Sequence, residues 1–133
     1  MAGNGAYVRL RSGDEHYALP VAETLEVIEL GTVDAVPGAP AAALGVRAVR
    51  GQPLPVFDLA HLIGGGKSAP AQIVVTQHRS GQVGLAVDEV LDVTELPPDH
   101  ADVDADSIRS SVLVDGTLVG VLDLDAALGR LGQ

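Results

Sequence analysis

The sequence contains no cysteine and very few aromatic residues. Without cysteine, its 133 residues can form no disulfide framework, thiol nucleophile or cysteine-ligated zinc site. Aromatic residues make up only 2% of the chain (Tyr7, Tyr17 and Phe57), whereas hydrophobic residues make up 47%. The core must therefore be built from valine, leucine, isoleucine and alanine. A composition rich in valine favours strands.

Positive charge and long apolar runs are also scarce. Eight basic residues against 18 acidic ones give a net charge of -10, which would repel the phosphates of nucleic acid. No apolar stretch approaches the roughly 20 residues that span a bilayer, and residues 1–6 lack the features of a signal peptide. We therefore expect a cytoplasmic protein that neither binds nucleic acid nor inserts directly into a membrane.

What the sequence does contain is an internal duplication. Residues 17–30 align with 83–96 without gaps at an offset of 66, and seven of the fourteen positions are identical. Residues 51–64 align with 116–129 at an offset of 65, with five identities. Two matches in the same order at nearly the same offset indicate a repeated structural unit. We expect one domain over residues 1–133, with halves at about 6–64 and 71–131.

Each half carries the pattern of short strands followed by a short helical turn. Apolar segments flanked by turn formers predict two hairpins, at 7–11 with 16–20 and at 73–77 with 82–87. Later turns precede further strands at 54–57 and 118–122. Helical turns should then begin at Asp58 and Asp123, as N-caps, and end at glycine. Short strands at this spacing favour small closed barrels. We expect residues 64–70 to form a connector and residues 97–106 an exposed acidic loop.

Few motifs suggest chemistry. The segment GGGKS at 64–68 resembles the end of a phosphate-binding loop, but His61 stands where that motif needs a glycine. Asp58 and Asp123 are related by the duplication and could act as a general acid and base, although capping explains both. We expect no catalytic residue, no cofactor and no metal. A ligand- or metal-regulated enzyme remains an alternative, which loss of activity on mutating either aspartate would favour.

Several segments together resemble one known family, the CheW-like domain of bacterial chemosensory systems. They are YALPV at 17–21, RG at 50–51, PVFDL at 55–59, VGLAVDEV at 83–90 and LD at 122–123. The resemblance covers about residues 6–131. It implies an all-β fold of two intertwined five-stranded β-barrels related by a pseudo-twofold, with a short helical turn after each half.

The resemblance also implies a function without catalysis. Family members couple the cytoplasmic tips of methyl-accepting chemoreceptors to the regulatory domain of a CheA-type histidine kinase, at membrane receptor arrays. A CheW-like adaptor of a type IV pilus or other chemosensory-like pathway is the alternative. Matched residue by residue, Thr24, Glu26 and Arg50 fall at partner-binding positions.

Two features bear on how far this match extends. The repeat partner of Arg50 is Asp115, and a reversal of charge is expected if only one half faces a particular partner. The family's usual N-L-R-G turn reads here with Ala48 in place of the asparagine, and Ser110 replaces the glycine expected opposite Gly45. We predict that Glu26 and Arg50 lie on the accessible surface near the junction of the barrels.

Overall fold

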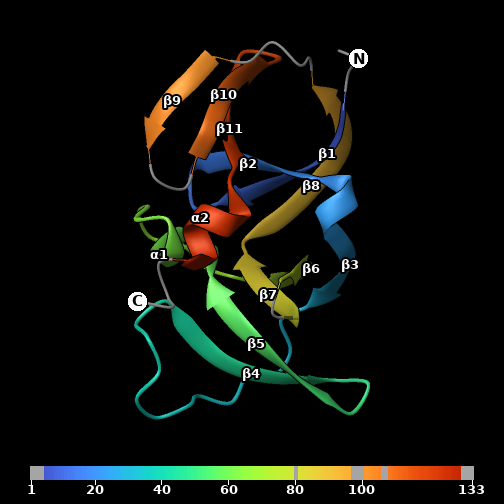
Figure 1. Cartoon of the computed structure of the whole chain (residues 1–133), viewed down its shortest axis with the longest axis vertical. Helices are drawn as coiled ribbons and strands as arrows, with labels where there is room; N and C mark the ends of the chain where they lie inside the picture. The colour runs from blue at the N-terminus through green and yellow to red at the C-terminus, as the bar shows by residue number, and fades with distance from the viewer. Residues whose placement is uncertain (1–4, 80, 97–100, 106–107, 130–133) are drawn as a thin grey trace.

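Two β-sheets make up almost the whole molecule. The computed structural model describes residues 5–79, 81–96, 101–105 and 108–129. One sheet has six strands in the order β8-β1-β2-β11-β10-β9, and the other has five in the order β3-β6-β7-β5-β4. Figure 1 shows the six-stranded sheet above the five-stranded sheet. The strands are β1 (Gly5–Ser12), β2 (Glu15–Pro20), β3 (Thr24–Glu29), β4 (Ala43–Val49), β5 (Gln52–Asp58), β6 (Gln72–His78), β7 (Gly81–Val87), β8 (Glu89–Leu96), β9 (Ala101–Ala105), β10 (Ile108–Val114) and β11 (Thr117–Leu122), and the helical segments are η1 (Val21–Glu23), α1 (Leu59–Leu62) and α2 (Leu124–Gly129).

The pairing of the strands confirms the duplication. Both predicted hairpins form, as β1 with β2 and β6 with β7, and each half adds a second hairpin, β4 with β5 and β10 with β11. In the parallel pair of β5 and β7, Val56 lies opposite Gly84. In the parallel pair of β11 and β2, Val121 lies opposite Ala18. The two pairs occupy the same positions of the repeat, which gives the fold its pseudo-twofold symmetry.

The two halves of the chain are intertwined, as predicted. The third strand of each half leaves its own hairpin and pairs with the first strand of the other half. Thus β3 pairs with β6, with Val27 opposite Val74, and β8 pairs with β1, with Val93 opposite Val8. Both sheets therefore contain strands from both halves.

The sheets differ from closed five-stranded barrels in two respects. Among the described strands, no pairing joins β3 to β4 or β8 to β9, so both sheets are open. The extra strand of the larger sheet is β9, which lies within the acidic stretch predicted as a loop. That prediction is wrong for residues 101–105, while 97–100 and 106 lie outside the described residues. Residues 101–105 alternate aspartate with alanine or valine, a period of two that suits a strand.

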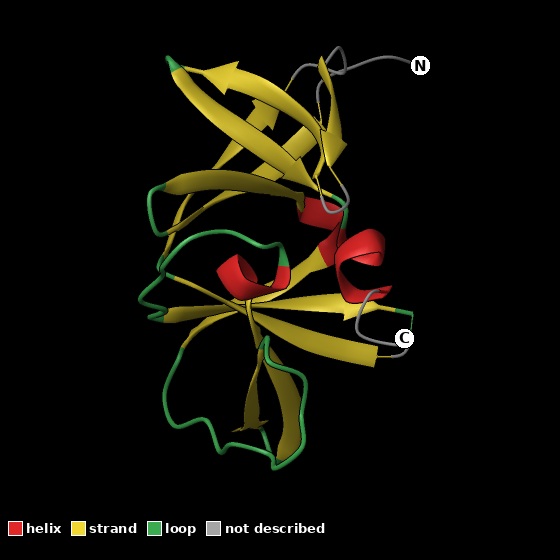
Figure 2. Ribbon diagram, turned by 90° about the vertical axis from the view of Figure 1, so that its left-hand side faces the viewer, coloured by secondary structure: helices red, strands yellow, loops and turns green. Residues whose placement is uncertain are grey.

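The main hydrophobic core lies between the two sheets. It combines buried residues of β1, β2, β6, β7 and β11 with the apolar faces of both helices. Figure 2 shows α1 and α2 in the middle of the molecule, between the sheets. Two smaller clusters lie within the individual sheets, one around Val56 and Val75 and one around Val119 and Val121. None of the described helices is long and apolar enough to cross a membrane.

Three of four residue pairs that the repeat equates have matching environments. Leu19 and Leu85 are buried, as are Val56 and Val121, whereas Val27 and Val93 are both exposed. The fourth expected pair is wrong, because Val21 is exposed and Val87 is fully buried. Val21 begins the 3-10 turn η1, which only the first half inserts after its hairpin, whereas Val87 ends strand β7.

Both aspartates predicted as N-caps occupy that position. The Asp58 carboxylate accepts a hydrogen bond from the backbone N–H of Ala60 at 3.2 Å and another from the Ser68 hydroxyl at 3.0 Å. The Asp123 carboxylate accepts one from the N–H of Ala126 at 3.1 Å. These bonds satisfy N–H groups that have no partner within a first helical turn. The capping prediction is confirmed.

The exchange of Gly45 for Ser110 has a local structural cause. Gly45 has a φ of +143°, and a Cβ atom there would lie 2.0 Å from the carbonyl oxygen of Asp34. Asp34 belongs to the segment after β3, and its backbone forms two hydrogen bonds with Val46 of β4. In the second half β9 takes this place beside β10, with Ala101 opposite the residue after Ser110. A side chain is accommodated there.

Candidate partner-binding surface

The turn that joins β4 to β5 presents Arg50 to solvent. Arg50 and Gly51 both have left-handed backbone conformations, with φ of +50° and +77°. Asp115 and Gly116 repeat this turn between β10 and β11, with φ of +49° and +81°. Two residues at positive φ form the tight turn that suits the twist of a hairpin. Because arginine and aspartate adopt the same conformation, the turn itself does not require a cation.

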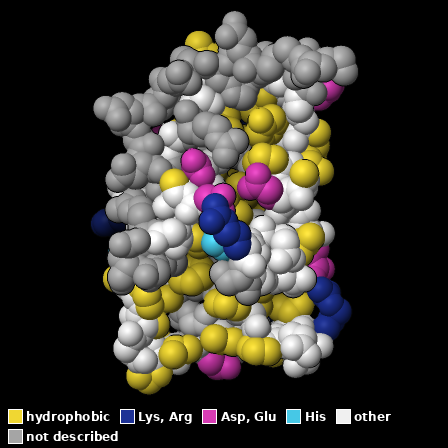
Figure 3. All heavy atoms as spheres, viewed as in Figure 1, with side chains coloured by type: hydrophobic (Ala, Val, Ile, Leu, Met, Phe, Trp, Pro, Cys, Tyr) yellow, Lys and Arg dark blue, Asp and Glu magenta, His cyan; other side chains and the backbone are white. Residues whose placement is uncertain are grey.

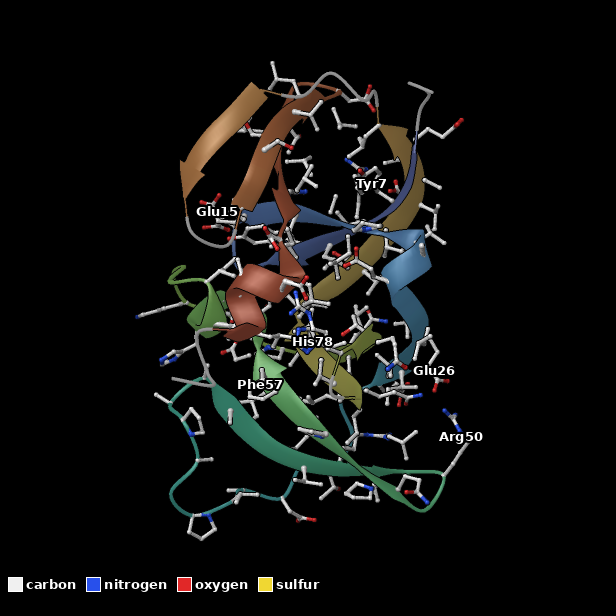
Figure 4. All side chains as sticks on the ribbon, in the orientation of Figure 1. Tyr7, Glu15, Glu26, Arg50, Phe57 and His78 are labelled. Atoms are coloured by element: carbon white, nitrogen blue, oxygen red, sulfur yellow. The ribbon has the colours of Figure 1, made fainter. Side chains whose placement is uncertain are left out.

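Arg50 forms a two-pronged ion pair with Glu26 of β3. The Nη1 atom of Arg50 donates to Oε2 of Glu26 at 3.2 Å, and Nη2 donates to Oε1. The side chain of Arg50 is 68% exposed and that of Glu26 is 31% exposed. Figure 4 shows the two side chains pointing toward each other, Arg50 from the hairpin of β4 and β5 and Glu26 from β3. Both residues lie on the accessible surface, as predicted, but the hairpin that carries Arg50 lies at the far end of the five-stranded sheet (Figure 1) and not near the junction of the two sheets.

Each partner of this ion pair changes the ionisation of the other. The hydrogen bond from Arg50 lowers the pKa of the Glu26 carboxyl, and the bond to Glu26 raises the pKa of Arg50. Water screens exposed charges strongly, so such pairs contribute little to folding stability. The pair therefore leaves a guanidinium and a carboxylate available to a second protein without the fold depending on them.

Thr24 does not take part in this ion pair. It begins β3 and is half-buried, and its hydroxyl donates to the carbonyl oxygen of Pro20 at 3.3 Å. This bond closes the 3-10 turn onto the start of the strand. The structure thus brings Glu26 and Arg50 together and gives the Thr24 hydroxyl a local backbone partner. A role of these three residues in binding partners stays a prediction.

In the second half, the acid at the equivalent position pairs with a cation on the neighbouring strand instead of at the turn. Asp92, the repeat partner of Glu26, pairs with Arg9 directly across from it on β1, at 2.8 Å and 2.9 Å. In the first half, the residue that lies opposite Glu26, and so corresponds to Arg9, is the buried Val75. Asp115, at the turn, raises the pKa of Arg9 further. The Arg9–Asp92 pair accounts for the reversed charge at the turn of the second half. Sequence reasoning missed this pair.

A shallow pocket of about 410 Å³ opens beside Arg50. Its floor includes Leu54 and Val75, which belong to the core of the five-stranded sheet. Polar side chains of Gln52 and Gln82 line it together with the guanidinium. A recess edged by amide side chains and a cation suits a carboxylate of a partner protein. No sequence motif indicates this pocket, because its residues come from four strands.

A second charged cluster ties α2 to the hairpin of β6 and β7. Asp125 lies 3.1 Å from Nε2 of His78 and 3.1 Å from Nη2 of Arg79. Bonding to Arg79 is the largest cause of the lowered pKa of Asp125. Figure 3 shows basic, acidic and histidine side chains together at the centre of this face. The cluster joins residues 46 or more positions apart, so no local pattern could have revealed it.

The fold and this surface can be compared with known proteins. A sequence profile of the CheW-like domain matches residues 6–131. The chain belongs to the CheW-like domain family. The probable chemotaxis protein CheW of Rhizobium etli and the chemotaxis protein CheW of Rhizobium meliloti are each 28% identical to it over 135 residues, which cover 93% of this chain and 87% of the relative.

A further relative and a solved structure also resemble this chain. Protein PilI of Pseudomonas aeruginosa is 30% identical over 95 residues, which cover 69% of this chain and 53% of PilI. The crystal structure of the scaffolding protein TtCheW from Thermoanaerobacter tengcongensis matches with a TM-score of 0.83 and 21% identity, covering 92% of this chain and 86% of that one. The resemblance read from the sequence is confirmed, and the solved structure shares the CheW-like fold.

Proposed function

We propose that this CheW-like protein is a non-catalytic adaptor that couples chemoreceptors to a CheA-type histidine kinase in chemotaxis. It acts in the cytoplasm as a single domain over residues 1–133 and is recruited to receptor arrays at the membrane. The CheW relatives from two Rhizobium species and the scaffolding protein of the same fold support this role. The proposed function needs no metal, cofactor or catalytic residue.

The observation that carries the proposal is the exposed ion pair of Glu26 and Arg50. Its guanidinium stands at a turn position where the repeat has aspartate, so folding does not explain the cation. The pocket beside it offers a recess for a side chain of a partner protein. Arginine is enriched among the residues that contribute most to protein–protein binding. Glu26 and Arg50, with Thr24 at the start of the same strand, therefore form the proposed receptor-facing surface.

The similarity to PilI favours a second candidate function. A CheW-like adaptor of a type IV pilus pathway would use the same surface with a different receptor and kinase. The two candidates differ only in their partners. Binding assays with the chemotaxis and the pilus receptors and kinases of the source organism distinguish them.

The test of the proposed surface is a charge reversal, Arg50→Glu. We expect its thermal midpoint to stay close to that of the wild type, and its capture of receptor or kinase to weaken. Arg79→Glu is the matched control, because Arg79 is also exposed and paired to one exposed carboxylate. It should leave capture unchanged.

A double variant separates the ion pair from the binding surface. Glu26→Arg combined with Arg50→Glu restores an internal ion pair of opposite direction, so it should fold normally and still bind partners weakly. The proposal fails if Arg50→Glu unfolds the protein. It also fails if that variant binds both partners as the wild type does.

A further inference from the structure

The hairpin of β6 and β7 meets helix α2 through three charged side chains. One oxygen of the Asp125 carboxylate lies 3.1 Å from Nε2 of His78, and the other lies 3.1 Å from Nη2 of Arg79. The side chain of His78 is 16% exposed, whereas that of Arg79 is 79% exposed. Figure 4 shows His78 in the middle of the molecule, beside α2. We call these three residues the α2 latch.

The internal repeat shows that the fold does not need these charges. The equivalent positions in the first half are Ser12, Gly13 and Ala60, none of which is charged. There the backbone of the connector lies against the tip of the hairpin, since a Cβ atom on Gly13 would lie 2.3 Å from the carbonyl oxygen of Lys67. The two hairpins thus meet their surroundings by different means. The α2 latch is an addition of the second half.

Helix α2 fills part of the main hydrophobic core. Its buried residues are Leu124, Ala127 and Leu128, which belong to the core between the two sheets. Because the helix has only six residues, its own backbone hydrogen bonds cannot hold it in place. The latch ties the helix to the five-stranded sheet, which contains β6 and β7. Opening of α2 would therefore expose the core that the latch helps to cover.

Histidine is the one residue type at the latch that ordinarily titrates near neutral pH. The described charged residues that line the pocket there are His78 and Arg79 from the hairpin, Asp125 from α2 and Glu23 from η1. Carboxylates and arginine ordinarily keep their charge from about pH 6 to about pH 8, whereas histidine ordinarily gains a proton within this range. A change of pH across this range therefore acts on the latch through His78.

The direction of the pH effect follows from the charges around the imidazole. Protonated His78 is attracted to Asp125 by its charge as well as by the hydrogen bond, and Glu23 lines the same pocket. Arg79 opposes this protonation, but its charge is exposed and screened by water, whereas the imidazole is mostly buried. The bonds to Arg79 and His78 lower the pKa of Asp125, which keeps its carboxylate charged. The latched state therefore binds protons more readily than the opened state, so the latch strengthens as the pH falls.

We propose that His78 and Asp125 form a pH-sensitive latch, which holds α2 against the five-stranded sheet more tightly at about pH 6 than at about pH 8. Arg79 contributes the part of the contact that does not change with pH in this range. The inference goes beyond the proposed function and does not depend on it, because no residue of the latch belongs to the Glu26–Arg50 surface.

Amide hydrogen exchange followed by NMR measures the opening of α2. The N–H of Ala127 donates to the carbonyl oxygen of Asp123 at 3.0 Å, so its protection factor, corrected for the intrinsic effect of pH on exchange, reports how often the helix opens. In the wild type this protection should be about two- to fivefold higher at pH 6 than at pH 8, which is the size expected of a partly exposed ion pair. His78→Gln keeps a hydrogen-bond donor without the charge, so it should abolish the difference. Asp125→Asn should abolish it too, and it serves as the second variant if His78→Gln does not fold.

Two control variants separate the titrating histidine from the other charges. His61→Gln is the matched control, because His61 is exposed on the other helix, α1, and this variant should keep the full difference between the two pH values. Arg79→Gln should lower the protection of Ala127 at both pH values and keep the difference between them.

Three results would overturn the inference. The first is equal protection of Ala127 at both pH values in the wild type, and the second is a difference that persists in His78→Gln or Asp125→Asn. The third is protection of Ala127 equal to that of Val74, which lies in β6 between β3 and β7. In that case α2 opens only when the whole protein unfolds, and the latch controls no separate movement.

Discussion

Replacing Gly45 with alanine should destabilise the protein strongly, although the repeat alone indicates that a side chain fits there. The second half of the chain carries Ser110 at the equivalent position. In the first half, however, a Cβ atom would lie 2.0 Å from the carbonyl oxygen of Asp34 and 2.6 Å from its carbonyl carbon. Both are backbone atoms, so no side-chain rotation can relieve the overlap.

The magnitude follows from two contributions. An alanine held at the φ of +143° found at Gly45 costs about 1–3 kcal/mol, because this region is strained for residues with a Cβ. Moving the backbone of Asp34 away breaks two hydrogen bonds to Val46, of 2.9 and 2.8 Å, each worth about 1 kcal/mol. The sum is about 3–5 kcal/mol, a large part of the roughly 5–15 kcal/mol that stabilises a typical domain.

Urea denaturation followed by circular dichroism measures this loss directly. Gly38→Ala is the matched control, because Gly38 has a φ of +80° in the same segment and a Cβ atom added there would meet nothing within 4 Å. It should cost only the backbone contribution, about 1 kcal/mol. If Gly45→Ala costs no more than Gly38→Ala, the reasoning from the Asp34 contact is refuted. Amide hydrogen exchange at Val46 should rise in the first variant alone.

Three further predictions concern the caps and the ion pairs. Asp58→Ala and Asp123→Ala should each lower the free energy of unfolding by about 1 kcal/mol, because each loses its N-cap hydrogen bond; urea denaturation of both variants checks this. The carboxyl pKa of Glu26, measured by NMR, should lie below its ordinary value of 4.5 and return to it in Arg50→Gln. Because that pKa is depressed in the folded state, the small contribution of the pair is complete above pH 4.5 and is lost as the pH falls through the folded-state pKa, so Arg50→Gln should flatten the acid limb of the stability profile only slightly.

Much of the secondary structure and the symmetry could be predicted because their signals are local or repeated. The hairpins follow from apolar segments around turn formers, and the capping aspartates follow from their position before short apolar helices. The duplication agreed with the pseudo-twofold that the family resemblance implied, because two aligned copies of one pattern adopt one local structure. The family followed from the order of these motifs, as the match over residues 6–131 confirms.

Other features depended on contacts between distant segments. The strand β9 was missed because its acidic composition suggested a loop, and only pairing with β10 makes it a strand. Val21 differs from Val87 because a 3-10 turn intervenes after the first hairpin alone. Positions in the chain placed Glu26 and Arg50 on the surface, but their ion pair required the fold to bring β3 beside a turn 24 residues away.

The sequence by itself determined most of the element types, the duplication, the caps and the family, because each of these is encoded in spacing along the chain. Tertiary structure alone decided which charges meet and which apolar side chains stay exposed. Arg9 pairs with Asp92 because the sheet brings β1 beside β8, from the other half of the chain. A single half contains the pattern for its strands, but its third strand pairs only with the other half, so β3 and its Glu26 reach their place in the sheet only when both halves have folded together.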